Sequence, residues 1–253
     1  MSEDDSVLDR AAREPDEVQA YGPLSDQVAD IYRPTHEFAA HDSVPLVVFF
    51  HGGFWRQRFD RRHVRPLAVA LASAGCTVAL VEYRRVGAGG TGGWPATFDD
   101  ARLALQTLAP RLAPCGPMVV GGHSAGGHLA LWAAGQPDLT PWARTVALAA
   151  VADLQACDDR HLGDDAARAL LPGTPATHPE VWRQADPARL PHPAAPVTLI
   201  HAADDAIVPL ALARSYAATH AGVTVIETEG GHYGLVDPLS PAWPTVRQAF
   251  VVP

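Results

Sequence analysis

A serine, an aspartate and a histidine in three separate segments have the surroundings that nucleophilic catalysis needs. Ser124 lies in GGHSAGGHLALWAAG (121–135), with glycines two residues before and two residues after it. Asp205 follows the apolar run PVTLIHA in the form D-x-x-V-P, and His232 lies in GGHYG after the run VTVIET. In a Ser–His–Asp triad the histidine takes the serine proton during attack on an acyl carbon, while the aspartate fixes the imidazole tautomer. These residues predict an acyl-enzyme on Ser124, released by water that His232 activates.

The sequence around Ser124 is typical of a strand, a sharp turn and a helix. In a G-x-S-x-G turn the serine has a strained backbone, and the glycines avoid clashes where strand and helix cross. The free N–H groups of the helix N-terminus then favour developing negative charge. Alone, the pattern fits equally well a glycine-rich turn in which Ser124 merely caps the helix.

A second glycine motif supports the catalytic interpretation. HGGFW (51–55) follows the buried run PLVVFF, one strand–helix–strand unit before the serine turn. Glycines let a loop turn its N–H groups toward a substrate, as in the oxyanion loops of hydrolases. We expect the oxyanion hole to use the N–H of Ala125 and that of Gly53 or Phe54.

Other acids and histidines are candidates for the same roles. Asp204, which directly precedes Asp205, is the second candidate for the triad acid, and a capping or solvated role is expected for it. Asp153 follows the run at 144–150 and is a further alternative, which fits the serine–acid–histidine chain order less well. Structural roles are expected for the remaining histidines near these motifs, namely His51, His123, His128, His201 and His220. Of these, His51 is expected to shape the oxyanion loop.

Apolar runs alternate with amphipathic segments along the chain. The runs interpreted as strands are 27–32, 45–50, 76–83, 118–122, 144–150, 196–202 and 223–228. Segments with helical periodicity are 63–75, 98–112, 124–135 and 211–222. This alternation predicts an α/β fold, with a mostly parallel sheet of about eight strands and helices on both faces.

The expected organisation is one domain over 21–253 behind an acidic arm at 1–20 that could remain partly disordered. Residues 153–195 are long, Pro-rich and lack a strand, so they form either a small irregular cap over the substrate or a surface excursion that only packs.

The bulk composition excludes several classes of partner. With 253 residues and a formal net charge of −9, the chain lacks the basic balance of a nucleic-acid or anionic-membrane surface. Its three cysteines, Cys76, Cys115 and Cys157, are widely spaced and form no CxxC pair, so neither a disulfide framework nor a zinc site is expected. The acidic N-terminus is unlike a signal peptide, which predicts a cytoplasmic protein. The serine chemistry expected above needs no cofactor, so none is expected.

With these motifs in hand, residues 21–250 resemble the α/β-hydrolase superfamily. HGGFW together with GHSAGGHLA resembles the small arylformamidases (kynurenine formamidases) and related carboxylesterases, including bacterial feruloyl and acetyl-xylan esterases. YGPLSDQVADIYRP (21–34) resembles the first strands of the arylformamidases. The resemblance implies that Trp55 lines the acyl pocket and that 153–195 covers part of the leaving-group pocket.

Aromatic side chains are also expected near the site on independent grounds. Phe54, Trp55, Trp94 and Tyr233 all lie on loops that should meet at the carboxyl ends of the strands, where ligands bind in open α/β sheets. Trp94 would equally well anchor its own glycine-rich loop.

The leading hypothesis is a serine hydrolase that cleaves carboxylic esters of small acyl groups. Its alternative is an arylformamidase acting on N-formylkynurenine-type amides. Weaker alternatives are an acyltransferase or thioesterase, and a catalytically idle member that binds a ligand. The expected partner is a small-molecule ester or amide, and the motifs do not fix the oligomeric state.

Overall fold

An eight-stranded sheet crosses the part of the chain that the computed structural model describes, namely residues 3–34, 44–112, 116–139 and 142–251. Its strands are β1 (Glu17–Ala20), β2 (Val28–Tyr32), β3 (Leu46–Phe50), β4 (Thr77–Val81), β5 (Met118–His123), β6 (Arg144–Leu148), β7 (Val197–Ala202) and β8 (Thr224–Thr228). Their spatial order is β1-β2-β4-β3-β5-β6-β7-β8. The six strands from β4 to β8 run parallel, whereas β1 and β2 are antiparallel at one edge. The mostly parallel α/β sheet predicted from the sequence is confirmed.

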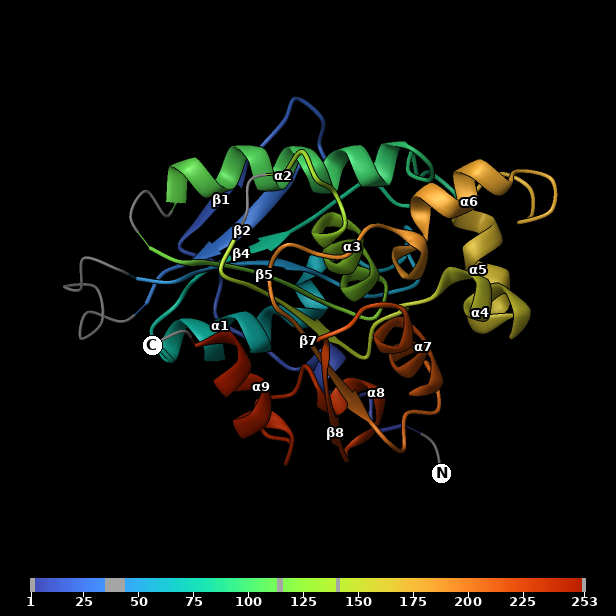
Figure 1. Cartoon of the computed structure of the whole chain (residues 1–253). Helices are drawn as coiled ribbons and strands as arrows, with labels where there is room; N and C mark the ends of the chain where they lie inside the picture. The colour runs from blue at the N-terminus through green and yellow to red at the C-terminus, as the bar shows by residue number, and fades with distance from the viewer. Residues whose placement is uncertain (1–2, 35–43, 113–115, 140–141, 252–253) are drawn as a thin grey trace.

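Helices cover both faces of the sheet (Figure 1). They are α1 (Arg65–Ser73), α2 (Ala96–Leu112), α3 (Ala125–Ala134), α4 (Leu154–Asp159), α5 (Leu162–Leu170), α6 (Pro179–Ala185), α7 (Ala211–Thr219), α8 (Gly231–Gly234) and α9 (Trp243–Phe250). Successive side chains of the fully buried β3 point to opposite faces of the sheet, which explains the two helical layers. Leu46, Val48 and Phe50 pack with α2 and α3 on one face. Val47 and Phe49 pack with α1 and α9 on the other. Among the described residues, no helix is long and apolar enough to cross a bilayer.

The two segments expected to lie outside the regular alternation have defined positions. Residues 153–195 form α4, α5, α6 and a 3₁₀ turn at Pro187–Arg189, gathered beside one end of the sheet (Figure 1). The described part of the acidic arm contains a 3₁₀ turn at Ser6–Asp9 and strand β1, which pairs with β2. The short sequence of β1, EVQA, is mostly exposed and carries no apolar run, so periodicity did not reveal it.

The crossing of α3 over β3 and β5 depends on glycine. A Cβ on Gly126 would lie 2.0 Å from the carbonyl oxygen of Phe50, and one on Gly122 would lie 2.2 Å from that of Gly126. Both contacts are with backbone, which cannot turn away as a flexible side chain can. The glycines on either side of Ser124 therefore let helix and strand touch.

Gly126→Ala should destabilise the fold because its methyl group would have to push α3 away from β3. Overpacking of this kind costs about 2 kcal/mol or more. A lower urea midpoint, measured by far-UV circular dichroism, would show the effect. Gly234→Ala is the matched control, since its Cβ would meet Ser240 only at 3.7 Å; equal midpoints for the two variants would contradict the explanation.

Candidate active site

Ser124 lies at the elbow between β5 and α3 in a conformation that residues with side chains rarely adopt. Its φ and ψ are 55° and −117°, and it directly precedes the first residue of α3, Ala125. Its N–H donates to Leu148 O at 2.8 Å, which ties the elbow to the neighbouring strand β6. Such strain persists only when the surrounding structure enforces it, and it is concentrated at functional sites.

Asp205 and His232 meet between the loops that follow β7 and β8. The Nδ1 of His232 lies 2.8 Å from Asp205 Oδ2, and both side chains are buried. Asp205 Oδ1 accepts hydrogen bonds from the N–H groups of Ile207 (2.9 Å) and Val208 (2.8 Å). Burial alone would raise the pKa of Asp205, but the hydrogen bonds from His201 and His232 and the charge of His232 hold it below its ordinary value. The carboxylate is therefore ionised at neutral pH and fixes the orientation of the imidazole.

Ser124 and His232 share one small cavity of about 170 Å³. Its wall is formed by residues from the N-terminal segment, the HGG loop and the chain between that loop and α1, the serine elbow, and the two loops after β7 and β8. These residues are Leu8, Gly53, Phe54, Arg58, Phe59, His63, His123, Ser124, Ile207, His232 and Tyr233. No hydrogen bond joins the Ser124 hydroxyl to His232 among the described residues. Such contacts often tighten only when a substrate is bound.

The loop after β3 has three consecutive residues with positive φ: Gly53 (110°), Phe54 (50°) and Trp55 (57°). Gly53 needs to be glycine for a second reason, because a Cβ there would lie 2.5 Å from that of Phe59. Gly53 and Phe54 line the cavity with Ser124, and neither amide N–H donates a hydrogen bond within the described part of the chain. The oxyanion hole expected at these two amides and at that of Ala125, the first residue of α3, stays a prediction.

A buried ion-pair network holds this loop from behind. His51 Nε2 lies 2.8 Å from Glu82 Oε1, and the ring stacks on Tyr83 at 4.4 Å. Arg61 and Arg85 also pair with Glu82, at 3.5 and 3.2 Å. Burial by itself would raise the pKa of Glu82, but His51 and Arg85 outweigh it and lower the pKa to about 2. His51 thus supports the loop, as expected from the sequence, and has no contact with the cavity.

His123 is a cavity residue that the sequence had suggested to be only structural. Its Nε2 lies 3.1 Å from the carbonyl oxygen of His232, and its ring centre lies 4.6 Å from that of His232. Burial and the adjacent His232 hold the pKa of His123 well below its ordinary value, so the ring is neutral. A neutral ring donates from Nε2 to that carbonyl, which fixes the backbone of His232.

The other candidate acids and histidines make structural contacts. His128 bonds to Ala185 O (3.0 Å) and His220 Nε2 lies 3.2 Å from Leu190 O. Asp153 caps α4 through Ala156 N and accepts from the Ser215 hydroxyl, so it does not approach His232. Asp204 accepts from the amides of Gly230 and Gly231, which makes it a capping residue rather than the imidazole partner.

Of the three aromatic residues expected to bind substrate, only Tyr233 lines the cavity. Trp55 is completely buried and its indole N–H donates to Ala125 O at 3.2 Å, so it joins the HGG loop to α3 instead of lining an acyl pocket. Trp94 packs on Phe98 at 4.8 Å and borders a separate hollow with Trp132. The structure therefore favours the anchoring role that was the alternative for Trp94.

Residues 153–195 do not contribute to the wall of the cavity, contrary to the covering role expected of them. Their contact with the site is indirect: Gly163 packs against the Phe54 ring, and Arg56 bonds to the Gly163 and Asp164 carbonyl groups. The wall comes instead from Leu8, Arg58, Phe59, His63 and Ile207. None of these was singled out from the sequence, since each becomes a neighbour of Ser124 only through tertiary folding.

Metal ligation has no support in the described residues, which contain no group of three or more His, Cys, Asp or Glu side chains that could hold an ion. Cys76 and Cys157 are buried free thiols, and Cys115 lies outside the described residues.

Replacing Glu82 by glutamine should lower stability in a pH-dependent way. A carboxyl whose pKa falls from 4.5 to about 2 on folding contributes about 3 kcal/mol at neutral pH. The contribution is complete above pH 5 and is lost as the pH falls from 4.5 toward 2. Urea unfolding at pH 7 and pH 3.5 should therefore show a gap between wild type and Glu82→Gln that narrows in acid.

Glu227→Gln is the matched control, because Glu227 forms an exposed pair with Arg214 and such pairs contribute less than about 1 kcal/mol. A Glu82→Gln gap that is as small as that of the control, or independent of pH, would contradict this account of the network.

Known proteins resemble this chain both in sequence and in fold. Residues 29–219 match the family model of BD-FAE. Kynurenine formamidase from Danio rerio is 30% identical over 110 residues, which are 44% of this chain and 35% of that protein. Esterase LipC from Mycobacterium tuberculosis is 27% identical over 241 residues, covering 85% of this chain and 58% of that protein. Neither match thus spans two thirds of the relative's own length.

Solved structures agree on the architecture. Esterase B from Lactobacillus rhamnosis superimposes with a TM-score of 0.73 at 20% identity, covering 97% of this chain and 87% of that one. A putative thioesterase from Silicibacter gives 0.71 at 23% identity, with 96% and 87% covered. These likenesses confirm the α/β-hydrolase fold that the motifs implied. Since the family model spans most of the chain, the protein belongs to the BD-FAE family, esterase-like members of the α/β-hydrolases.

Proposed function

We propose that this hydrolase cleaves carboxylic esters of small acyl groups through an acyl-enzyme on Ser124. The observation that carries the proposal is the common cavity of Ser124 and His232, whose imidazole is held by the ionised Asp205 at 2.8 Å. The strained elbow at Ser124 and the free amides of the HGG loop support the same chemistry.

The steps follow from the roles of these groups. Ser124 Oγ attacks the acyl carbon and its proton passes to His232 Nε2, while Asp205 stabilises the imidazolium. The amides of Ala125 and of Gly53 or Phe54 donate to the oxyanion. His232 then protonates the departing alcohol as the ester bond breaks. A water molecule attacks the acyl-enzyme, gives its proton to His232, and the carboxylic acid leaves as Ser124 recovers its proton.

The cavity limits the substrate by its size and lining. A volume of about 170 Å³ is smaller than a typical site for a drug-sized ligand, and the walls at Phe54, Phe59 and Ile207 are apolar. This combination favours a short acyl group, or a compact aromatic group, next to Ser124.

Ser124→Ala should lower the hydrolysis of p-nitrophenyl acetate at least about 10⁴-fold, because no other group can form the acyl-enzyme. A fluorophosphonate probe should label the wild type and leave this variant unlabelled. Ser73→Ala, which changes an exposed serine at the end of α1, is the control and should keep both activity and labelling. Wild type and Ser124→Ala with equal turnover would refute the proposal and favour an idle, ligand-binding protein.

Asp205→Asn should cost about 10⁴-fold in kcat, because an amide favours the wrong imidazole tautomer. Asp204→Asn keeps an oxygen that accepts from the Gly230 and Gly231 amides, so its loss should be at least a hundredfold smaller. Steady-state kinetics of the two variants decides which acid acts, and a larger loss at Asp204 would reverse the assignment.

Formamide hydrolysis is the second candidate, favoured by the 30% identity to kynurenine formamidase over 110 residues. Ester hydrolysis and formamide hydrolysis can be distinguished by measuring kcat/KM on four substrates: N-formylkynurenine, p-nitrophenyl acetate, p-nitrophenyl octanoate and methyl ferulate. We expect the acetate to exceed the octanoate at least tenfold in kcat/KM. Turnover of N-formylkynurenine far above that of every ester would instead identify an arylformamidase.

A further inference from the structure

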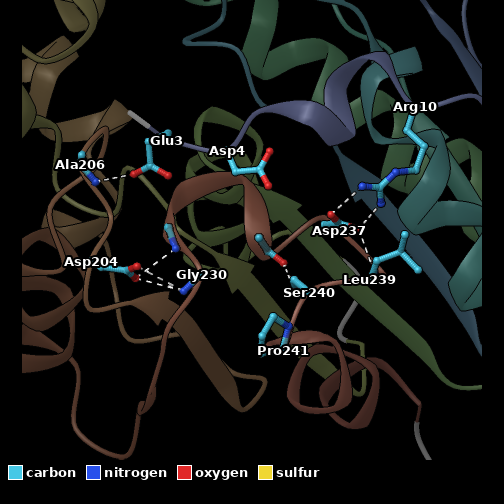
Figure 2. Close-up of a pocket in the computed structure, with 12 residues that line it drawn as sticks. Glu3, Asp4, Arg10, Asp204, Ala206, Gly230, Asp237, Leu239, Ser240 and Pro241 are labelled. Carbon is cyan, nitrogen blue, oxygen red and sulfur yellow. Dashed lines mark hydrogen bonds and ion pairs between the residues drawn. The ribbon is translucent and has the colours of Figure 1, made fainter. Parts of the chain in front are cut away.

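The N-terminal segment Glu3–Arg10 lies across the catalytic loops. Val7 in its 3₁₀ turn is buried in the core on the α1 and α9 side. At its end the Arg10 guanidinium makes a two-point ion pair with Asp237, with Nη2–Oδ2 at 2.9 Å (Figure 2). The segment is thus attached to the rest of the domain by a buried side chain within its turn and by an ion pair directly after it.

The carboxylate of Glu3 joins the two loops that carry the candidate acid and base. Its Oε1 accepts from the N–H of Ala206 at 2.7 Å, directly after Asp205, and its Oε2 accepts from the N–H of His232 at 2.8 Å. Figure 2 shows the Glu3 side chain directed at the Ala206 amide. The Glu3 side chain therefore bridges the backbone amides of Ala206 and His232, which lie in the C-terminal part of the sequence.

The loop before His232 is shaped to receive this carboxylate. A Cβ on Gly231 would lie 2.0 Å from Glu3 Oε2, so Glu3 occupies space that a larger residue would take. The amides of Gly230 and Gly231 are already held by Asp204 (Figure 2). With Glu3 on the third amide, all three consecutive N–H groups of 230–232 point at carboxylates, which fixes the backbone that presents the imidazole.

The same segment reaches the substrate cavity itself. Leu8, on the 3₁₀ turn, lines the cavity together with Ser124, His232 and Tyr233. The pKa of Tyr233, which also lines the cavity, is raised by burial first and then by the negative charges of Asp5 and Glu3.

We propose that two residues of the segment Glu3–Arg10 belong to the active site: Glu3 is a positioning residue for Asp205 and His232, and Leu8 is a specificity-determining residue that limits the length of the acyl group. This inference rests on the proposed hydrolase function. A misplacement of about 1 Å in a catalytic group can cost about 10²-fold in rate, so a bridge between the acid and histidine loops is a means of keeping kcat high. A leucine in the wall of a cavity this small sets the space left for substrate.

The role of Leu8 is tested by changing the size of its side chain in both directions. Leu8→Ala should raise the octanoate-to-acetate ratio of kcat/KM for p-nitrophenyl esters at least about fivefold, because it lengthens the cavity. Leu8→Trp should lower the same ratio. A merely structural residue would change both substrates alike, so a constant ratio in both variants would overturn the specificity role.

The role of Glu3 is tested by removing its two acceptors in steps. Glu3→Ala should lower kcat for p-nitrophenyl acetate about 10- to 100-fold with KM changed less than threefold. Glu3→Gln keeps one acceptor oxygen and should lie between the alanine variant and wild type. Asp9→Asn, an exposed residue on the same segment, loses the same charge and should match wild type. Melting temperatures within about 2 °C of wild type would show that the fold persists.

The outcomes separate the two proposals. If wild type is active, Ser124→Ala is inactive and the Glu3 variants keep the wild-type kcat, the positioning role is wrong while the hydrolase function stands. A Glu3→Ala loss that appears only in KM, or that Asp9→Asn reproduces, overturns it too. If wild type and Ser124→Ala are equally inert, the proposed function is wrong, and the roles of Glu3 and Leu8 that depend on it are wrong as well.

Discussion

The direct contact between α3 and β3 is the constraint on which the site depends. Because Gly126 brings the helix against the Phe50 carbonyl, the chain must reverse within one residue, and that residue is Ser124 with its positive φ. The same closeness lets the Trp55 indole reach Ala125 O. Elbow and HGG loop are thereby fixed to one another by backbone packing. Ser124, Gly53 and Phe54 consequently line the same cavity.

The buried carboxylate of Glu82 stabilises the HGG loop. Glu82 would be costly in the interior without partners, and it has them in His51, Arg61 and Arg85. Those partners come from the HGG loop, from the turn before α1 and from the segment after β4. The network thus stabilises this loop conformation, because a loop that moved away would leave the buried charge of Glu82 with fewer partners. Asp205 follows the same logic on the other side of the cavity, where backbone amides and histidines keep it ionised.

The cavity is assembled from parts that are distant in the chain. The parallel strands bring the HGG loop, the elbow and the loops after β7 and β8 to the same edge of the sheet. The N-terminal segment completes the cavity: Glu3 accepts a hydrogen bond from the N–H of His232, and Leu8 lines the cavity wall. The segment 153–195, which we expected to cover the site, does not line the cavity and instead contacts the loop after β3 at Phe54 and Arg56. The cavity is therefore bounded by residues from several loops.

The sequence by itself determined the elements that obey local rules. Buried β-branched runs are typical of parallel strands, the G-x-S-x-G and HGG motifs require glycine for steric reasons, and the acid and histidine follow strand ends in a recognisable order. It also indicated His51 as a support of the loop.

Only the tertiary structure decided which side chains face the cavity. Trp55 and Trp94 carry the aromatic character expected of a binding wall, yet packing turns Trp55 into the core and Trp94 toward Phe98. Leu8 and Glu3 lie in a charged stretch without periodicity, and nothing local relates them to residues more than 100 positions away. Orientation and long-range proximity are set by how the layers pack, a property of the whole chain that no short pattern contains.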